Sequence, residues 1–555
     1  MRKYLFAIVA LTSAASGCSD NPYDPDAPAI DPNAPKVHIT TPMRGTVAGD
    51  VKKITVTGTA TDDTSVASVT VNDVPAALAA DGTWTVDIPV VPGTNLIHAV
   101  AKDGQDNTGK ESRAVVAGPQ ADLSTQVPNA ITATLSAQTF DAIGRGAAGF
   151  IKTADLEAMI APMNPVIHAG DPMGPDCLYG QAHITSMTVG DAAITLAPQT
   201  GGLFMDAELS NVQIGMHLQW SVSCLDGSRD ITIGASHLSV SGNLAVGLIG
   251  HDFDIHLDNP NVQITGFDLQ LGGIPQTIID LLHIDSALGP VLGWATEKFV
   301  TPMINKSLAG LNDVRTIQVL NAQFDISVKP AKINFSNAGA VVQLDTSLRA
   351  HGDKGKYVYV PNTVPAMDLS HGFQLAVADD AANQAATSLW SAKALDETIK
   401  LAGNGSYGDV GKLYDSVELE TKVPPFVDAS DAQKGLVLTM GDLMATFRNG
   451  ASVATQVAIN AQVALKVATG PDGKMRFDVG QPTVYVDILD ENVDGANQLS
   501  NAQFEAITSF ALARVVVVGS AAVGTIPLPA AGGVAVQDLS IGSQAGYLVV
   551  AGDVQ

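Results

Sequence analysis

ITSMTVGDAAITLAPQTGGLFMDAELSNVQIGMHLQWSVSC, residues 184–224, carries the pattern from which the fold of the main body of this chain can be predicted. Apolar and polar residues alternate along it, which is typical of strands whose sheet has one buried face. The alternation predicts two strands, His183–Ala197 and Leu203–Cys224. Two more follow at Ile231–Leu248 and His251–Leu271, so we expect a sheet of long strands.

The strand that begins at His251 separates its two faces clearly. Phe253 and Ile255 point to one face, together with Leu257, while aspartates and a histidine occupy the alternate positions. These polar positions can bind a metal or can simply face water, and we favour the solvated face. The apolar face predicts the inner side of the sheet.

An amphipathic helix precedes the long strands. Phe140, Ile143 and Phe150 recur at helical spacing with Ala147 and Ala154, and charged residues lie off that stripe. A second helical stretch, residues 276–311, carries Leu282 and Phe299 on a broad apolar face, with prolines expected to interrupt it. An apolar helix face against such strands encloses an interior that is either packed or hollow.

The second half of the chain repeats this order of elements. A helix is predicted to begin at Asp379 or Asp380 and to present Leu389. Another begins at Ser500, where Gln503 completes a capping box, and presents Phe504 and Ile507. Strands are predicted around these helices at 316–328, 333–347, 372–378, 435–448, 452–468, 475–489, 534–541 and 547–551.

Residues 37–118 form a separate unit of short strands divided by turn signals, which predicts a β-sandwich. Its segments TVTGTATDD (55–63) and DGTWTVDIPVVPGTNLIHAVAKDGQDNTG (81–109) resemble bacterial immunoglobulin-like modules. Such modules serve as spacers or adhesive units. Its turn aspartates can bind calcium, although solvated turn acids are the interpretation that we favour.

The N-terminus predicts export and lipidation. A short basic segment and an apolar stretch form a signal peptide over residues 1–17, and Cys18 follows small residues as in a bacterial lipobox. Acyl chains such as palmitate on Cys18 would hold the protein at the outer membrane, on its periplasmic or surface face. Residues 18–36 are rich in proline and aspartate and predict an extended tether.

Composition excludes several classes of function. Acidic residues outnumber basic ones 56 to 30, giving a net charge of −26, which opposes nucleic-acid binding. Mean hydropathy is +0.19, which indicates either large cores or an internal apolar surface for a ligand. The remaining cysteines, Cys177 and Cys224, most simply form a disulfide in an oxidising compartment.

Catalytic signatures are missing from the sequence. Gly405-Ser406-Tyr407-Gly408 does not complete a nucleophile elbow, and no HExxH or phosphate-binding motif occurs. The loop at 490–495 begins like a calcium site but has Asn501 where the bidentate glutamate is needed. We therefore expect no enzyme activity, no cofactor and no metal.

The order of elements over residues 121–555 resembles the tubular lipid-binding family of the bactericidal/permeability-increasing protein, lipopolysaccharide-binding protein and cholesteryl ester transfer protein. The resemblance lies in three segments: residues 184–224, residues 278–328, and the tail GTIPLPAAGGVAVQDLSIGSQAGYLVVAGDV (524–554). It implies an α+β fold, mainly β, in which two helix-wrapped curved antiparallel sheets, residues 119–330 and 331–555, form a boomerang with apolar tunnels. A single disulfide in the first module also fits this family.

The resemblance implies that the chain binds or transports lipid and acts as a monomer. This chain has no basic cluster of the kind that captures lipopolysaccharide, so we expect phospholipid-like cargo held by its acyl chains. The alternatives left open are a surface adhesion or structural lipoprotein and, less favoured, an envelope hydrolase. The residues expected to line the tunnels are Phe140, Ile143, Phe150, Phe253, Ile255, Leu282, Phe299, Leu389, Phe504 and Ile507.

Overall fold

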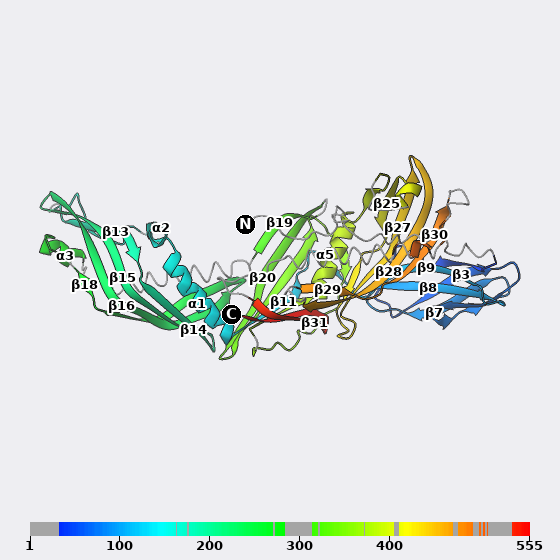
Figure 1. The fold of residues 1–555 in the computed structure, drawn as a ribbon, viewed down its shortest axis with the longest axis horizontal. Coiled ribbons are helices and arrows are strands. Elements are labelled where there is room, and N and C mark those ends of the chain that lie inside the picture. The colour runs from blue at the N-terminus through cyan, green and yellow to red at the C-terminus, as the bar shows by residue number, and fades with distance from the viewer. Residues whose placement is uncertain are drawn as a thin grey trace.

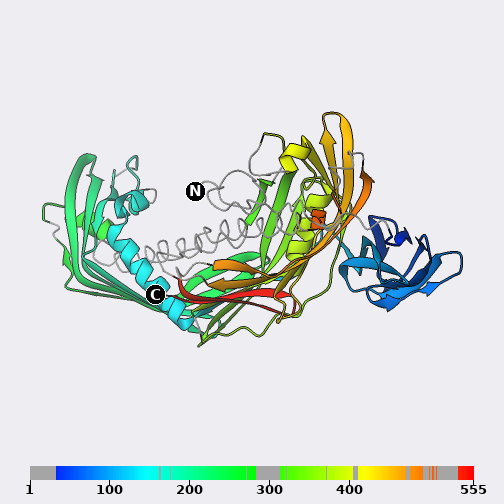
Figure 2. The same ribbon diagram turned by 45° about the vertical axis from the view of Figure 1, so that its right-hand side comes forward.

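The computed structural model is an elongated, mainly β molecule in which four units follow one another along the long axis (Figure 1). It describes residues 33–161, 164–174, 177–269, 272–282, 313–319, 322–370, 372–403, 410–469, 475–491, 499–500, 503–505, 508 and 536–554. Seen from a second direction, the three units of the main body form a shallow arch, and the immunoglobulin-like module extends beyond one end (Figure 2). The predicted fold class is confirmed.

The immunoglobulin-like module is a sandwich of two sheets. Alternating apolar residues of both sheets, including Ile39, Val56, Trp84 and Ile97, form its buried core. One sheet contains β1 (Lys36–Thr41), β3 (Lys53–Thr61), β7 (Thr83–Pro89) and β6 (Ala77–Leu78). The other contains β2 (Thr46–Gly49), β9 (Thr108–Ala117), β8 (Gly93–Asp103), β4 (Val66–Val71) and β5 (Val74–Pro75).

The first end of the arch is a strongly curved antiparallel sheet, which we call the N-terminal sheet. Three helices accompany it: α1 (Ala137–Thr153), α2 (Leu156–Ile160) and α3 (Gln276–Leu282). Its strands are β12 (Ile167–Gly170), β13 (Tyr179–Thr188), β14 (Asp191–Gln199), β15 (Gly202–Val222), β16 (Leu225–Ile249), β17 (Asp252–Thr265) and β18 (Asp268–Leu269).

Two predicted strands of this sheet are each divided into two. The strand expected over His183–Ala197 is divided between β13 and β14 at Gly190, because both shorter strands pair with β15 in succession. The strand expected over His251–Leu271 is β17 followed by β18, which pairs farther along β16. Alternation alone does not show these breaks, since the pattern continues through them.

The middle of the arch is a seven-stranded antiparallel sheet, the central sheet, which receives strands from distant parts of the chain. The predicted boundary between residues 330 and 331 falls inside its strand β20, so this sheet belongs to both predicted modules. Its order is β19 (Asp313–Val319), β20 (Ala322–Ser336), β21 (Gly339–Ala350), β11 (Val127–Ser136), β23 (Phe373–Ala378), β32 (Tyr547–Val554) and β31 (Val536–Gln544). A small ladder joins β10 (Gln120–Asp122) to β22 (Lys356–Val358).

The other end of the arch is the C-terminal sheet, next to the immunoglobulin-like module (Figure 1). Two helices, α5 (Asp379–Ser391) and α6 (Val410–Leu413), lie beside it. Its strands are β24 (Glu397–Lys400), β25 (Ser416–Thr421), β26 (Phe426–Asp428), β27 (Leu436–Asn449), β28 (Ser452–Thr469), β29 (Met475–Val479) and β30 (Thr483–Glu491). The strand predicted at 475–489 is therefore β29 and β30, both paired with β28.

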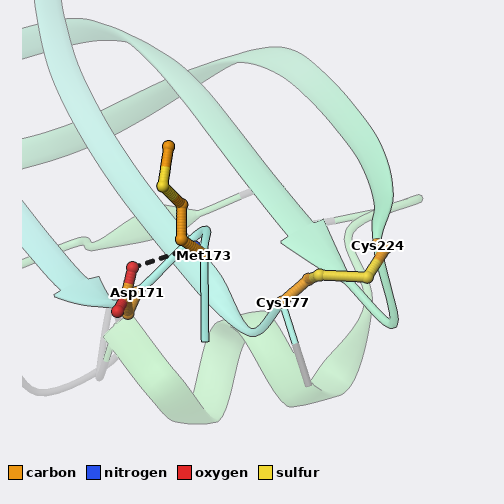
Figure 3. Close-up of a disulfide and its surroundings, with 4 residues drawn as sticks. All are labelled: Asp171, Met173, Cys177 and Cys224. Carbon is orange, nitrogen blue, oxygen red and sulfur yellow. Dashed lines mark hydrogen bonds between the residues drawn. A yellow bond between two sulfur atoms is a disulfide. The ribbon is translucent and has the colours of Figure 1, made fainter. Parts of the chain in front are cut away.

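The predicted disulfide is present at the tip of the N-terminal sheet (Figure 3). Cys177 precedes β13, and Cys224 lies in the turn between β15 and β16. The two cysteines are 47 residues apart in sequence, so the chain-entropy model assigns the crosslink about 4 kcal/mol at most. It ties the loop before β13 to the end of the longest strand ladder.

Helix α1 lies diagonally across the N-terminal sheet (Figure 2) and begins where β11 ends. Ser136 caps it by accepting a hydrogen bond from the backbone N–H of Thr139 at 3.3 Å. Small residues form part of its buried face, and the absent side chain of Gly144 allows a close approach to β14. A Cβ at Gly144 would lie 2.4 Å from the carbonyl oxygen of Ile194, whereas one at Gly149 would meet nothing within 4 Å.

Helix α5 joins the central and C-terminal sheets through polar side chains. Gln384 accepts from the backbone N–H of Leu348 at 2.7 Å and donates to the carbonyl of Thr125 at 2.7 Å. Asn383 exchanges two hydrogen bonds with the backbone of Val427 in β26. These fully paired amides satisfy backbone groups that would otherwise be buried without partners.

At the start of α5, Asp380 is buried and Asp379 is partly buried, and both carboxylates accept hydrogen bonds from backbone N–H groups and from the Asn362 amide. Asp380 accepts from the N–H of Val360 at 3.2 Å and from the Asn362 amide at 3.2 Å. Burial, reinforced by the neighbouring Asp379, raises the pKa of Asp380 to about 7. Burial also raises the pKa of Asp379, and Asp428 adds to that rise.

We expect Gly144→Ala to destabilise the docking of α1 by about 1–3 kcal/mol, because its methyl group overlaps the backbone of β14. Gly149→Ala, in the same helix but facing open space, should stabilise α1 by about 0.5–1 kcal/mol. Hydrogen exchange of α1 and β14, measured by mass spectrometry, distinguishes the two variants. Equal protection in both would contradict the close packing of Gly144.

We expect Asp380→Asn to increase the free energy of unfolding at pH 8 and to have much less effect near pH 4. The folded protein holds a proton on Asp380 up to about pH 7, whereas the unfolded chain releases it near pH 4, so stability falls as pH rises through this window. Urea unfolding of both proteins at pH 4, 6 and 8 measures this difference. Asp268→Asn, at an exposed position, is the control; a gain that does not grow with pH would refute the assignment.

Candidate functional site

The candidate site is the interior of the N-terminal sheet, where one apolar cluster extends from α3 to the central sheet. Leu282 of α3 packs at one end of this cluster, and Ala340 of β21 and Phe335 of β20 belong to the other end. The inner faces of the long strands β15 and β16 supply the middle. We call this cluster the N-terminal interior.

The alternation of both long strands changes phase at the same level of the sheet. In β15 the buried positions are Leu203, Met205 and Ala207, and then Val212, Ile214, Met216 and Leu218. The phase changes beside Asn211, whose φ is +51°. In β16 the buried set shifts from Ile231, Ile233 and Ala235 to Leu238 and Val240, directly opposite. A simple period of two would turn the second half outward, so these matched changes keep one apolar inner face while the sheet bends.

The edge strand β17 has the two faces that the sequence predicts. Ile255 is buried in the N-terminal interior, and Phe253 and Leu257 pack against it while keeping partial exposure. On the opposite face His256 lies 3.7 Å from Asp254 and 3.4 Å from Asp258, and all three side chains are about half exposed. This polar face is solvated, as we favoured from the sequence.

The structure gathers five of the predicted tunnel residues in the N-terminal interior. Phe140, Ile255 and Leu282 are buried there, while Ile143 and Phe253 pack against the cluster with partial exposure. The ring of Phe140 contacts that of Phe335 with centroids 5.9 Å apart. Apolar side chains of the cluster therefore keep partial exposure on both α1 and β17.

The other predicted residues lie elsewhere. Phe150 is 45% exposed on α1. Leu389 packs in a separate cluster with Phe324 and Ile326 of the central sheet. Phe504 belongs to the core of the C-terminal sheet, where its ring lies 5.7 Å from that of Phe447. Cys18, Phe299 and Ile507 lie outside the described residues, as does most of the helical stretch 276–311 beyond α3.

The predicted capping box before Phe504 forms. The backbone N–H of Ser500 donates to Oε1 of Gln503 at 2.7 Å, and the N–H of Gln503 donates to the Ser500 hydroxyl at 3.3 Å. This reciprocal pair positions Phe504 in the core of the C-terminal sheet. The sequence motif therefore predicted the hydrogen bonds between Ser500 and Gln503 correctly, because these two residues are only three positions apart.

The side chains gathered in the N-terminal interior are apolar and can bury hydrocarbon. Within the described residues, no group of three or more His, Cys, Asp or Glu side chains is placed to hold a metal ion. The helices of this part of the chain include none that is long and apolar enough to span a bilayer. What the N-terminal interior presents is a large cluster of buried apolar side chains, with partly exposed apolar residues packed against it.

Sequence reasoning missed two polar clusters. One is the set of buried amides and carboxylates on α5. The run of polar residues on the inner side of this helix is the sequence signal that could have revealed it. The other links the immunoglobulin-like module to the C-terminal sheet through Arg44, Asp442 and Asp487. These three residues are far apart in sequence, so no local pattern connects them.

The comparison with family models identifies residues 35–118 as similar to the family described as glucodextranase, domain B. Together with the observed sandwich, this match confirms the immunoglobulin-like fold of the N-terminal module. It covers that module alone. No curated protein matches the chain.

Among solved structures, lipopolysaccharide binding protein is similar at 15% identity, covering 77% of this chain and 99% of that one, with a TM-score of 0.36. P47 of Clostridium botulinum E1 is similar at 8% identity, covering 77% and 98%, with a TM-score of 0.25. P47 from Clostridium botulinum A2 is 11% identical, covering 76% and 96%, with a TM-score of 0.27. The expected family is thus represented among the similar structures, at low similarity.

Proposed function

We propose that this protein is a non-catalytic, lipid-anchored component of a bacterial envelope that binds or transfers phospholipid through its N-terminal interior. The observation that carries the proposal is the apolar cluster of that interior, whose members Ile143, Phe253 and Leu257 remain partly exposed. An acyl chain entering there would replace water against apolar side chains of both α1 and β17. No catalytic group is needed for this function.

The free energies of hydrocarbon transfer and of association favour a lipid with two acyl chains over one with a single chain. A chain of about sixteen carbons gains roughly 13 kcal/mol gross on leaving water, at ~0.8 kcal/mol per methylene. Association costs at least about 4 kcal/mol in lost freedom, and imperfect packing adds to that cost. A second acyl chain adds its full gross gain without a second loss of overall translation, so phospholipid is the better-retained ligand.

Charge favours recognition through the hydrocarbon. The net charge of −26 repels anionic headgroups over most of the surface. The outer face of β17 adds three aspartates beside the proposed entrance, with His256 between two of them. A zwitterionic or neutral headgroup that stays in solvent avoids this repulsion.

We expect phospholipid to co-purify with the mature chain carrying Cys18→Ser. Native mass spectrometry should show added masses that organic extraction removes and identifies. Phe253→Gln, which places an amide on the inner face of β17, should reduce retained lipid several-fold, whereas His256→Gln on the outer face of the same strand should leave it unchanged. Hydrogen exchange of β16 and β17 verifies that both variants fold.

Preparations of the folded wild type that are empty under mild purification would refute lipid binding. Equal lipid retention in the Phe253 and His256 variants would instead show that the bound lipid lies outside the N-terminal interior. The two results therefore separate the existence of the ligand from its location.

The proposed lipid anchor at Cys18 is tested separately, in the full-length precursor expressed in a bacterium. Feeding an alkyne analogue of palmitate should label the wild type, and the protein should sediment with outer membranes. Cys18→Ser should abolish both the label and the sedimentation, because several acyl chains supply the membrane affinity. A Cys18→Ser protein that still sediments with membranes would contradict the proposed anchor.

A further inference from the structure

The immunoglobulin-like module contacts the C-terminal sheet through a buried apolar surface. Ala114 and Val116 of β9 form one cluster with Val423 and Val358, and Phe426 of β26 packs against it. The approach is so close that a Cβ at Gly441 of β27 would lie 2.3 Å from the Ala114 side chain. Interlocked apolar surfaces of this kind resemble a core more than a contact between mobile domains.

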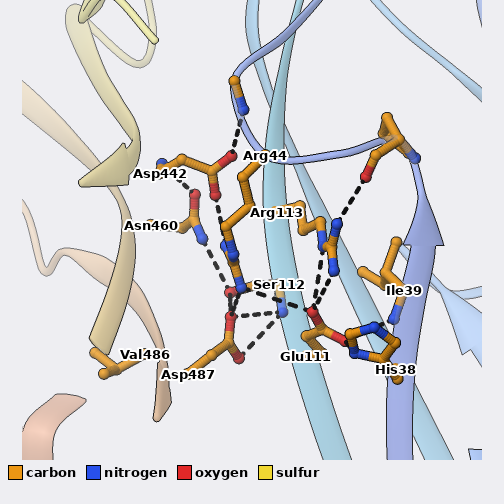
Figure 4. A network of polar contacts seen from close by, with 12 residues as sticks. His38, Ile39, Arg44, Glu111, Ser112, Arg113, Asp442, Asn460, Val486 and Asp487 are labelled. Carbon is orange, nitrogen blue, oxygen red and sulfur yellow. Dashed lines mark hydrogen bonds and ion pairs between the residues drawn. The ribbon is translucent and has the colours of Figure 1, made fainter. Parts of the chain in front are cut away.

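A buried ionic cluster lies beside this apolar surface (Figure 4). Arg44, from the loop after β1, places Nη1 2.6 Å from Oδ1 of Asp442 and Nη2 3.1 Å from Oδ2 of Asp487. The Arg44 side chain is 13% exposed and that of Asp442 is fully buried. A guanidinium from one unit therefore lies between two carboxylates of the other. We call this arrangement the Arg44 clamp.

The carboxylates of the clamp have further donors, so the charges are held by hydrogen bonds as well as by each other. The backbone N–H of Ser112 in β9 donates to both oxygens of Asp487, at 3.1 and 3.0 Å. Asn460 donates to the Ser112 hydroxyl at 3.1 Å and accepts from the N–H of Asp442 at 2.8 Å. Asp487 therefore accepts hydrogen bonds from both Arg44 and Ser112 of the sandwich, and Asn460 links Ser112 to the backbone of Asp442.

We propose that the immunoglobulin-like module is a fixed arm of the C-terminal sheet, locked by the Arg44 clamp, and not a freely moving spacer. Separating the units would strip Asp442 and Asp487 of Arg44 and expose the apolar surface around Ala114. Breaking a buried, hydrogen-bonded ion pair by removing one partner is strongly unfavourable, because it leaves a buried charge uncompensated. Both parts of the interface therefore favour one orientation.

The interface is not built to open with pH, because its titratable groups respond in opposite directions. Burial raises the pKa of Asp487 to about 6 against the pull of Arg44, and burial also raises the pKa of Glu505. These two groups strengthen docking as pH falls. Burial lowers the pKa of His98, which stacks on Tyr485 at 4.0 Å, to about 4, so His98 weakens docking over the same range.

The other charged groups that face this interface belong to the sandwich. Lys110 opposes a proton on His98, and Asp73 favours one. Glu111 pairs with Arg113 at 3.0 Å and lies 3.1 Å from His38.

If the immunoglobulin-like module is a fixed arm, its position determines at which end of the molecule the tether is attached. The module lies beyond the C-terminal sheet, and the N-terminal sheet is at the opposite end (Figures 1 and 2). If Cys18 anchors the chain, the proposed lipid site in the N-terminal interior lies at the end of the arch opposite the end that carries the module. This consequence rests on the proposed anchor, whereas the clamp itself does not.

The experiment measures the distance between spin labels by double electron–electron resonance in the mature chain with Cys18→Ser. Labels at Thr85→Cys in the sandwich and Thr398→Cys in the C-terminal sheet occupy exposed positions. The disulfide between Cys177 and Cys224 does not react with the label. We expect one narrow distance distribution, and a broad distribution in this protein would overturn the proposal.

Two variants test the two parts of the interface independently. Arg44→Gln removes the guanidinium, and Gly441→Val inserts a side chain against Ala114; each should raise the undocked fraction by about 100-fold or more and broaden the distribution. Lys53→Gln, at an exposed ion pair within the sandwich, and Gly247→Val, where no atom lies within 4 Å of a Cβ, are the matched controls.

Narrow distributions in both interface variants would show that the clamp does not hold the module, and would refute the proposal. Circular dichroism verifies that each variant retains its sheets. If one variant fails to fold, the other still decides the question, because one acts on charge and the other on shape. Lipid retention is measured in parallel, so loss of docking is distinguished from failure of the lipid-binding function.

Discussion

A curved antiparallel sheet has one concave apolar face, and the burial of that face is the constraint on which the rest of this structure depends. The long strands of the N-terminal sheet bend while keeping their apolar positions inward, which requires the matched changes of phase beside Asn211 in β15 and opposite it in β16. Other elements must then pack over this apolar face to shield it from water. Helix α1 supplies part of it, approaching β14 closely at Gly144.

The apolar cluster beneath helix α1 is not uniformly buried. Side chains such as Ile143 and Phe253 pack against its buried residues yet keep some exposure. These partly exposed apolar positions are where the proposed lipid would enter.

The units beyond this sheet are held by polar contacts as much as by apolar ones. Helix α5 inserts Asn383 and Gln384 between backbone groups of both neighbouring sheets, and Arg44 lies between two buried aspartates. Hydrogen bonds and ion pairs of this kind are directional, so they fix orientation where apolar contact alone permits sliding. The arch and its immunoglobulin-like module are therefore joined by directional contacts as well as apolar ones.

Patterns of nearby residues were enough to predict the local properties of the chain: the strand faces around Phe253 and Ile255, the helix at Asp379, the capping box at Ser500 and the sandwich of residues 37–118. The pairing of Cys177 with Cys224 was also foreseen, because only two cysteines follow Cys18. Each of these follows from the spacing of nearby residues or from a simple count. Three features could be seen only in the folded chain: β11, β23 and β32 complete one central sheet, Leu389 and Phe504 lie away from the N-terminal interior, and Arg44 contacts Asp442 and Asp487. These are contacts between residues up to several hundred positions apart, and their partners are selected by the bend of the sheets and by the need to pair every buried polar group, neither of which leaves a periodic signal in the chain.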